Sequence, residues 1–254
     1  MKAPHLFVIS SAINHFCANK LSRFSTQERF NQTMETINNI KEKVPGAKIC
    51  LFEVSETRLD EIYIDEIKNS VDLFVELYND NKIIELYNNF VKFKDLFKYG
   101  KSLFELYGMI YALNLIDDKF GANNIDRVFK ISGRYLLNSD FDINQYNSVF
   151  LKNKYIAKCV KYSNYEPNSN AHFHIYQNKG HLITGLWSFD SSLLYKTIDT
   201  LEKAFNYLQI LLMYGDGNDI EHSIYHFIDK NDLIDCDVLG LYVRKGMDDD
   251  NYNI

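Results

Sequence analysis

The chain has 254 residues, of which 46% are hydrophobic and 24% are charged, and its formal net charge is −6. This length can bury one sizeable core, so we expect one domain rather than two small ones. The acidic balance argues against a protein that holds a nucleic-acid backbone, because such proteins usually present a basic face. The net negative charge is still compatible with a local basic pocket for a small phosphate ligand.

Cysteine spacing and hydropathy set two further limits. The four cysteines lie far apart without CxxC spacing, which argues against a zinc site or a disulfide framework and favours small buried hydrophobic residues. They are Cys17, Cys50, Cys159 and Cys236. No apolar run has transmembrane length, and the N-terminal stretch lacks the pattern of a signal peptide. We therefore expect a protein without a membrane span, located in the cytoplasm, or in the host cytoplasm if the source is a virus.

The first third of the chain alternates between apolar strands and amphipathic helices. Three strands are predicted from apolar runs, at 4–13, 47–55 and 72–79. Two helices are predicted between them, at 25–44 behind a Ser25/Thr26 cap and at 57–71 behind Thr57. This β-α-β-α-β order predicts a parallel sheet covered by helices.

The rest of the chain predicts a more mixed arrangement. Helices are expected at 80–100, at 100–116 (an apolar helix lying under the sheet), at 191–215 and at 216–229. A fourth strand begins near Asp126, and further short strands are expected at 153–162, 171–177, 181–189 and 236–246. Residues 247–254 are predicted to be a frayed tail. The prediction is one α/β domain with a mixed second half.

Several common motifs are excluded by their spacing. "YGKS" is no phosphate-binding P-loop, because Asp95 stands where that motif needs a glycine, and "GDGNDI" ends in Ile220 where a dinucleotide fingerprint needs a small residue. The sequence has no GxSxG and no HExxH motif. His172 and His174 share one face of a predicted strand but have no third ligand nearby, so we interpret them as structural or solvent-facing.

Polar and cationic residues follow the predicted parallel strands. In open α/β sheets, ligands bind beyond the carboxyl ends of the strands. The residues expected at that edge are Ser10, Ser11, Asn14 and Arg23 after the first strand, Glu53, Ser55 and Arg58 after the second, and Ser132, Gly133, Arg134 and Tyr135 after the fourth. Hydroxyls, a permissive glycine and cations along one edge suit a nucleotide diphosphate. Lys101, in a predicted helix start, is either a further anion contact or a solvated surface lysine.

Arg134 is an unusual residue in its surroundings. Only six of the 28 Lys and Arg residues are arginine, and this one stands in the middle of an otherwise apolar predicted strand. A buried guanidinium without a partner is costly. Arg134 therefore either pairs with an acid such as Asp140 or binds a phosphate or carboxylate of a ligand.

The order of these elements, with the strand "KISGRY" in fourth place, resembles the GT-A-fold glycosyltransferases, and most closely small viral and bacterial ones. The resemblance covers most of the chain, with 1–138 similar to the donor half of these enzymes, 139–246 to the acceptor half, and 247–254 as a tail. It implies a Rossmann-like, mixed but mainly parallel sheet flanked by helices. It also implies the transfer of a hexosyl or deoxyhexosyl group from a nucleotide-sugar donor to a glycan or other hydroxyl acceptor.

In that family, an Asp-x-Asp at the end of the fourth strand holds Mn²⁺ or Mg²⁺ against the donor diphosphate. Here that place reads Ser132-Gly133-Arg134, and Asp140 and Asp142 come later. Two hypotheses follow: either the two aspartates are a displaced metal motif, or Lys130 and Arg134 supply the positive charge instead of a metal. We favour the cationic alternative, since Asp142 also suits a turn followed by a helix cap.

Inverting members of the family need a general base near the acceptor hydroxyl, which commonly lies at the start of a late helix. The candidates here are Asp219, Glu221 and His222. Asp219 suits the N-cap, so we expect Glu221 to be the base and His222 its neighbour. Two alternatives stay open. A sugar-nucleotide nucleotidylyltransferase would need a Gly-rich loop after the first strand, which is missing, and a non-catalytic nucleotide- or carbohydrate-binding protein could share the fold.

Overall fold

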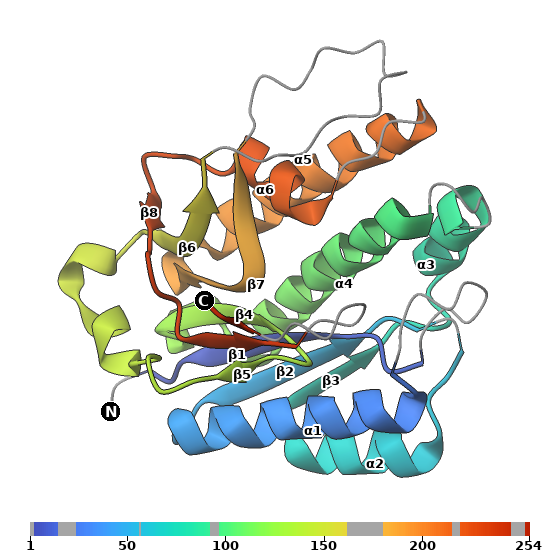
Figure 1. The fold of residues 1–254 in the computed structure, drawn as a ribbon, viewed down its shortest axis with the longest axis horizontal. Coiled ribbons are helices and arrows are strands. Elements are labelled where there is room, and N and C mark those ends of the chain that lie inside the picture. Colours follow the sequence, from blue (N-terminus) through green and yellow to red (C-terminus); the bar gives the residue numbers. More distant parts are fainter. Residues whose placement is uncertain are drawn as a thin grey trace.

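A seven-stranded sheet forms the centre of the protein in a computed structural model, which describes residues 3–14, 24–55, 57–91, 97–161, 180–214, 219–244 and 252–254 (Figure 1). The strand order is β3-β2-β1-β4-β7-β6-β8. The strands are β1 Leu6–Ser11, β2 Lys48–Glu53, β3 Leu73–Glu76, β4 Arg127–Ser132, β6 Tyr155–Val160, β7 His181–Asp190 and β8 Leu233–Asp235. Of these seven strands, only β7 runs antiparallel to its neighbours. The predicted mixed, mainly parallel α/β sheet is confirmed.

Helices cover both faces of this sheet. Helices α1 Thr26–Lys43 and α2 Glu61–Ser70 lie along one face, and α4 Phe97–Phe120 lies along the other (Figure 1). Helix α5 Leu194–Met213 packs against α4, and α6 Ile220–Phe227 packs against α5 and β7. The remaining helical segments are α3 Asn81–Leu86, a π-helix Tyr87–Val91, and the 3₁₀ turns Ala122–Asn124, Ile143–Asn147, Val149–Leu151 and Ser191–Leu193. In the described ranges, no helix is long and apolar enough to cross a membrane.

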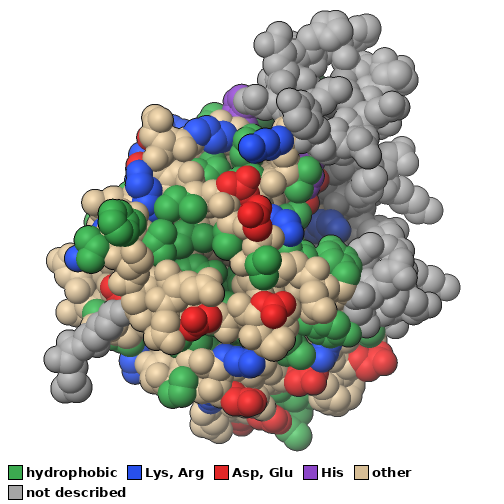
Figure 2. All heavy atoms as spheres, turned by 60° about the vertical axis from the view of Figure 1, so that its left-hand side comes forward, with side chains coloured by type: hydrophobic (Ala, Val, Ile, Leu, Met, Phe, Trp, Pro, Cys, Tyr) green, Lys and Arg blue, Asp and Glu red, His purple; other side chains and the backbone are tan. Residues whose placement is uncertain are grey.

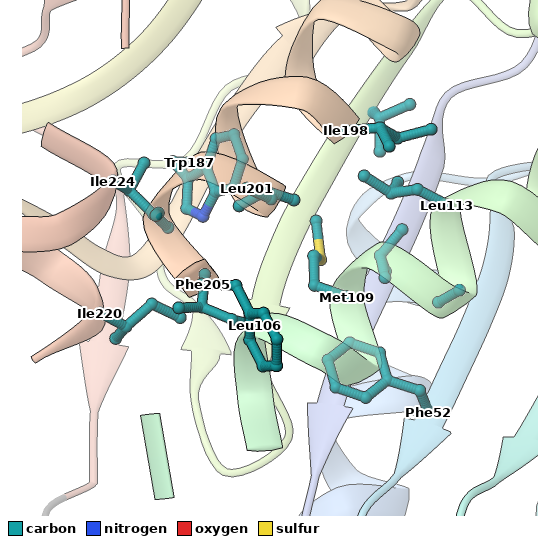
Figure 3. Packing of buried hydrophobic residues seen from close by; sticks show 14 of the residues in the cluster. Phe52, Leu106, Met109, Leu113, Trp187, Ile198, Leu201, Phe205, Ile220 and Ile224 are labelled. Atoms are coloured by element: carbon teal, nitrogen blue, oxygen red, sulfur yellow. The ribbon is translucent and has the colours of Figure 1, made fainter. Parts of the chain in front are cut away.

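The two-residue period of the strands divides the buried side chains into two clusters. In β4, Phe129 and Ile131 join the cluster under α1 and α2, whereas Val128 joins the larger cluster under α4, α5 and α6. Figure 3 shows this larger cluster, with Met109 of α4 and Leu201 of α5 among its members. Lys130 shares the face of Val128, so its ammonium group is directed toward α4. This placement determines much of the site described below.

The start of α1 is the best-defined helix end. Ser25 caps it as predicted, accepting a bond from the Glu28 amide, while the Glu28 carboxylate accepts one from the Ser25 amide at 2.7 Å. This reciprocal pair is a capping box.

We expect Ser25→Ala to lower the free energy of unfolding by about 1 kcal/mol, because it leaves an amide of the first turn without its partner. Urea denaturation followed by circular dichroism would measure the change. Ser191→Ala, outside the first turn of any α-helix, is the control and should leave stability nearly unchanged.

Four sequence predictions need correction. Helix α2 begins at Glu61 behind Asp60 rather than behind Thr57. Helix α4 is already formed at Phe97, so Lys101 lies past the first turn, where amides are bonded within the helix, and the argument from a helix start is wrong. The predicted strand at 236–246 is only β9 Leu241–Val243, and β8 was not predicted.

The end of the chain is the fourth correction. Residues 252–254 are not frayed, since β10 Tyr252–Asn253 pairs with β9, which also pairs with β5 Leu136–Leu137 in a small second sheet. The amide of Ile254 donates to the Leu241 carbonyl at 2.8 Å. The predicted strand at 171–177, with His172 and His174, lies outside the described residues.

The surface agrees with the mixed charge of the chain. On the face drawn in Figure 2, acidic and basic side chains of the described residues are interspersed with hydrophobic ones rather than gathered in one basic patch.

Candidate functional site

The carboxyl ends of β1, β2 and β4 meet at one edge of the sheet. Ser10 of β1 lies beside Ser132 of β4, and Ser11 lies beside Glu53 of β2. The structure thus brings together Ser10, Ser11, Glu53 and Ser132 from the polar residues that the sequence places after the first, second and fourth strands. Because β7 is antiparallel to β4, its first residues lie at the same edge.

The segment after β4 is held tightly between β1 and α1. The Gly133 amide donates to the Ser10 carbonyl at 2.8 Å, and a Cβ on Gly133 would lie only 3.1 Å from that oxygen. Thr36 of α1 donates its hydroxyl to the Tyr135 carbonyl at 3.0 Å. Arg134 therefore extends from a fixed turn just beyond the strand, not from within the strand as the sequence suggested.

Arg134 has a buried nitrogen that finds no partner in the described part of the chain. Its Nη1 atom makes no hydrogen bond to any described residue, and within the described ranges no acid, Asp140 included, forms an ion pair with it. Its guanidinium lies 6.0 Å from the centre of the Tyr135 ring. A buried guanidinium N–H without an acceptor is costly, and an anionic ligand would remove that cost.

A second guanidinium lies close to the first. Burial lowers the pKa of Arg29 to about 10, the charge of Arg134 adds to this decrease, and Glu53 opposes it. Arg29 also donates to the Ala12 carbonyl, in the segment that follows β1. Arg29, in the first turns of α1, and Arg134, after β4, thus both bring positive charge to this edge of the sheet, which sequence analysis found only in part, since it omitted Arg29.

Lys130 is used within the protein. It is 2% exposed, and its ammonium lies 2.5 Å from Glu105 Oε1, 2.8 Å from the Thr184 carbonyl and 3.2 Å from Ser132 Oγ. An ammonium has three N–H donors, so these three partners saturate it. Lys130 is a counterion for Glu105 rather than a group with a donor left for a ligand.

Glu105, on α4, is a site residue that sequence analysis missed. Its Oε1 atom also accepts a hydrogen bond from Ser10 at 2.9 Å. Burial acts to raise the pKa of this carboxyl, but the charge and hydrogen bond of Lys130, with help from Ser10 and Lys101, prevail and lower it. The detectable signal was a single acid in the apolar run 103–116, the same kind of signal that identified Arg134.

Glu221 lies on the opposite side of this network. Its Oε1 atom accepts from the Thr184 hydroxyl at 3.3 Å. Burial raises the pKa of Glu221, the charges of Asp219 and Glu105 raise it further, and Lys130 and Thr184 oppose the rise. A partly buried carboxylate with a raised pKa in the first turn of α6 is well suited to accept a proton.

Asp219 has the capping role that the sequence predicts. It accepts from the His222 amide at 2.9 Å and lies 2.7 Å from His222 Nδ1. The ring of His222 in turn lies 4.8 Å from that of His181, the first residue of β7. Asp219 and His222 thus form a pair next to Glu221.

Glu53 and Ser55 have internal roles. Glu53 is fully buried, accepts from the Ile13 amide at 2.6 Å, and also accepts from the Ser55 hydroxyl. Burial raises the pKa of Glu53, and the nearby Ser11 hydroxyl and the bonds from Ser55 and Ile13 oppose the rise. These contacts fasten the segment after β1 to the end of β2.

The other predicted residues are more peripheral. Lys101 is exposed one turn before Glu105, and Arg23 lies outside the described residues. Asp140 and Asp142 are exposed, and Asp142 caps the turn Ile143–Asn147 by accepting from the Asn144 amide.

The end of β4 does not fit Mn²⁺ or Mg²⁺. The side chains there are a hydroxyl, a glycine and a guanidinium, and a guanidinium would repel a cation. Among the described residues, no group of three or more His, Cys, Asp or Glu side chains is placed to hold a metal ion.

Comparison with known proteins establishes the fold. The sequence matches no protein-family model and no curated protein. Among solved structures, the mannosyltransferase Ktr4p from S. cerevisiae is similar with a TM-score of 0.52 and 13% identity, over 91% of this chain and 68% of that one. An active-site mutant of LgtC is similar with a TM-score of 0.51 and 10% identity, over 90% and 71%. The chain has a GT-A-like fold.

A third similar structure does not bear on the question of function. The 4-diphosphocytidyl-2C-methyl-D-erythritol synthase from Anaerococcus prevotii has 13% identity over 78% of this chain and 74% of that one, but its TM-score is only 0.39. At all these identities the likeness concerns the fold, so function has to be argued from the site.

Proposed function

We propose that this protein is a glycosyltransferase that moves a hexosyl or deoxyhexosyl group from a nucleotide-sugar donor to a hydroxyl of a glycan or another acceptor, with inversion at the anomeric carbon. The observation that supports it best is the buried, unpartnered Nη1 of Arg134 at the ligand-binding edge of a GT-A-like fold. Residues 1–138 would form the donor half, 139–246 the acceptor half, and 247–254 the end of the chain.

The donor diphosphate would lie against Arg134, with Arg29 close by. The leaving group of such a donor develops negative charge as its bond to the sugar breaks, and fixed cations near that charge lower the barrier. Ser10, Ser132, Gly133 and Tyr135 form the surrounding edge. Lys130 would act indirectly, because its three donors already bind Glu105, Thr184 and Ser132.

Glu221 would be the general base. In a single displacement, the acceptor oxygen forms a bond to the anomeric carbon while the bond from that carbon to the diphosphate oxygen breaks. The diphosphate leaves with the electron pair, and Glu221 takes the proton of the acceptor hydroxyl. Asp219 and His222 would hold the first turn of α6 so that this carboxylate keeps its position.

We expect Arg134→Ala to weaken binding of a nucleoside diphosphate at least tenfold, because a charge-assisted bond in a partly buried site contributes roughly 1.5–3 kcal/mol. Lys101→Ala, which removes an exposed ammonium, is the matched control and should change binding little. Isothermal titration with UDP, GDP, CDP and TDP measures both. Equal losses for the two variants would assign Arg134 to a structural role.

Turnover assays separate the proposed activity from its rivals. A glycosyltransferase releases a nucleoside diphosphate, whereas a nucleotidylyltransferase exchanges pyrophosphate, and a binding protein does neither. We expect release of the nucleoside diphosphate, and the same rate in excess EDTA if arginine replaces the metal. Loss of turnover in EDTA that Mn²⁺ restores would return Asp140 and Asp142 to consideration.

A further inference from the structure

The candidate site is divided into a cationic end and an acidic end. Arg134 lies at one end, where Arg29 also binds the Ala12 carbonyl after β1. At the other end, Lys130 joins Glu105 to the Thr184 carbonyl, and the Thr184 hydroxyl donates to Glu221. Tyr135 lies between the two ends. Burial raises the pKa of its phenol, Arg134 opposes the rise, and Glu105 and Glu221 both add to it. The Tyr135 ring packs directly on Gly185 of β7. The contact is so close that a Cβ atom added to this glycine would lie only 2.9 Å from Cε2 of the tyrosine.

At the acidic end, Glu105 is both held in place and partly open. Its Oε1 atom takes the bonds from Ser10 and Lys130, so the carboxylate cannot rotate without breaking two charge-assisted contacts. No described residue bonds to its Oε2 atom, and the side chain is 28% exposed to solvent. A carboxylate has lone pairs on both oxygens, so Glu105 retains an acceptor directed away from its partners.

We propose that Glu105 accepts a hydrogen bond from a hydroxyl of the donor sugar, and that the site therefore selects nucleotide sugars with an uncharged sugar over those with a sugar acid. This inference rests on the proposed function and adds to it the class of donor. If the diphosphate of the donor binds at the arginines, its sugar lies on the side of Glu105 and Glu221. Sugar hydroxyls can donate to both carboxylates, whereas a sugar carboxylate would meet two like charges, and Lys130, the ammonium bound to Glu105, has no donor left for it.

The test is a titration of three ligands that share one nucleoside. They are the nucleoside diphosphate, its neutral hexose derivative and the matching uronate: UDP, UDP-glucose and UDP-glucuronate, or GDP, GDP-mannose and GDP-mannuronate, according to which diphosphate binds. In the wild-type protein, we expect the uronate to bind at least tenfold more weakly than the neutral sugar.

The variant Glu105→Gln should narrow that preference. It replaces a charged acceptor by a neutral one, so the neutral sugar should lose about tenfold in affinity, the typical effect of a hydrogen bond to a charged group, while the bare diphosphate should bind as before. Asp118→Asn, an exposed acid on the same helix, is the matched control and should change none of the three.

Each outcome has one meaning. If the wild-type protein binds the uronate as well as the neutral sugar, or if Glu105→Gln weakens the diphosphate as much as the sugar nucleotide, the inference is wrong although the proposed function stands. If no nucleoside diphosphate binds at all, the proposed function itself fails. Should Glu105→Gln not fold, the wild-type preference still decides, and Glu105→Asp, which keeps the charge for Lys130 but retracts it from the sugar, replaces the variant.

Discussion

Replacing Glu221 by glutamine is expected to lower the rate of sugar transfer by about 10²–10⁴, the usual contribution of a general base. Glutamine keeps the size of the side chain and an oxygen that can accept from the Thr184 hydroxyl, but it cannot take the proton of the acceptor. The affinity for the nucleoside diphosphate should be unchanged, because the arginines of the cationic end remain. Single-turnover kinetics with a saturating donor would measure the loss, and titration with the nucleoside diphosphate would verify donor binding.

The neighbours of Glu221 provide the controls. Asp219→Asn should act mainly on stability, by no more than about 1 kcal/mol, since asparagine can still cap the helix and only the negative charge toward the helix dipole and His222 is lost. A Glu221→Gln protein with a normal rate would move the base to Asp219 or His222. If single variants at all three positions remained active, an inverting mechanism based on this helix would be untenable.

The same residue predicts how activity depends on pH. Glu221 accepts a proton only when ionised, so kcat/KM should fall as the pH falls through its pKa. Burial and the charges of Asp219 and Glu105 raise that pKa, while Lys130 and Thr184 restrain it, so the loss should occur above the usual range of a glutamic acid. A profile of kcat/KM against pH measures the pH at which activity is lost on the acid side. Glu105→Gln should move this acid limb toward lower pH, because the charge of Glu105 raises the pKa of Glu221. A limb at the ordinary value would contradict the raised pKa.

The parts of the fold that sequence predicted well are those with local causes. The strands β1, β2 and β4 follow from short apolar runs, and the start of α1 follows from the Ser25 cap. Polar residues at the end of a predicted parallel strand also indicate which edge of the sheet binds a ligand. For this reason the ends of two parallel strands sufficed to predict that Ser10 and Ser132 lie at the same edge, where they are neighbours.

The parts that sequence could not predict depend on partners far apart in the chain. Lys130 was expected to face a ligand, but its charge is taken up by Glu105, which stands on a different helix. The last residues were expected to fray, yet they find an edge at β9 that exists only in the folded chain. A lone charge in an apolar run indicates that a partner exists, but not whether that partner is another side chain or a ligand.

Lys130→Met is the variant for which we expect the largest loss of stability. Lys130 is 2% exposed, and methionine would fill a similar volume without the charge. The change leaves Glu105 without its counterion and the Thr184 carbonyl without its donor. Removal of one partner of a buried ion pair costs roughly 3–5 kcal/mol; because Glu105 is 28% exposed, we expect the lower limit, about 3 kcal/mol. Thermal unfolding should shift by roughly 6–12 °C in a chain of this size.

A double variant and a surface control give this prediction its meaning. If the loss comes from an uncompensated carboxylate, Lys130→Met with Glu105→Gln should be more stable than Lys130→Met alone, because the charge that lost its partner is then absent.

Lys203→Met removes an ammonium 2.6 Å from Asp199, where both side chains are more than half exposed, so it should cost no more than about 0.5 kcal/mol. Urea denaturation of the wild-type protein, these three variants and Glu105→Gln alone measures the coupling between Lys130 and Glu105. If Lys130→Met were no more harmful than Lys203→Met, Glu105 would not depend on Lys130 as its counterion. The ammonium could then serve a ligand, as the sequence suggested. If instead Lys130→Met is harmful and the double variant recovers stability, Lys130 is fixed as a positioning residue, and Arg134 remains the cation after β4 that can meet an anionic donor.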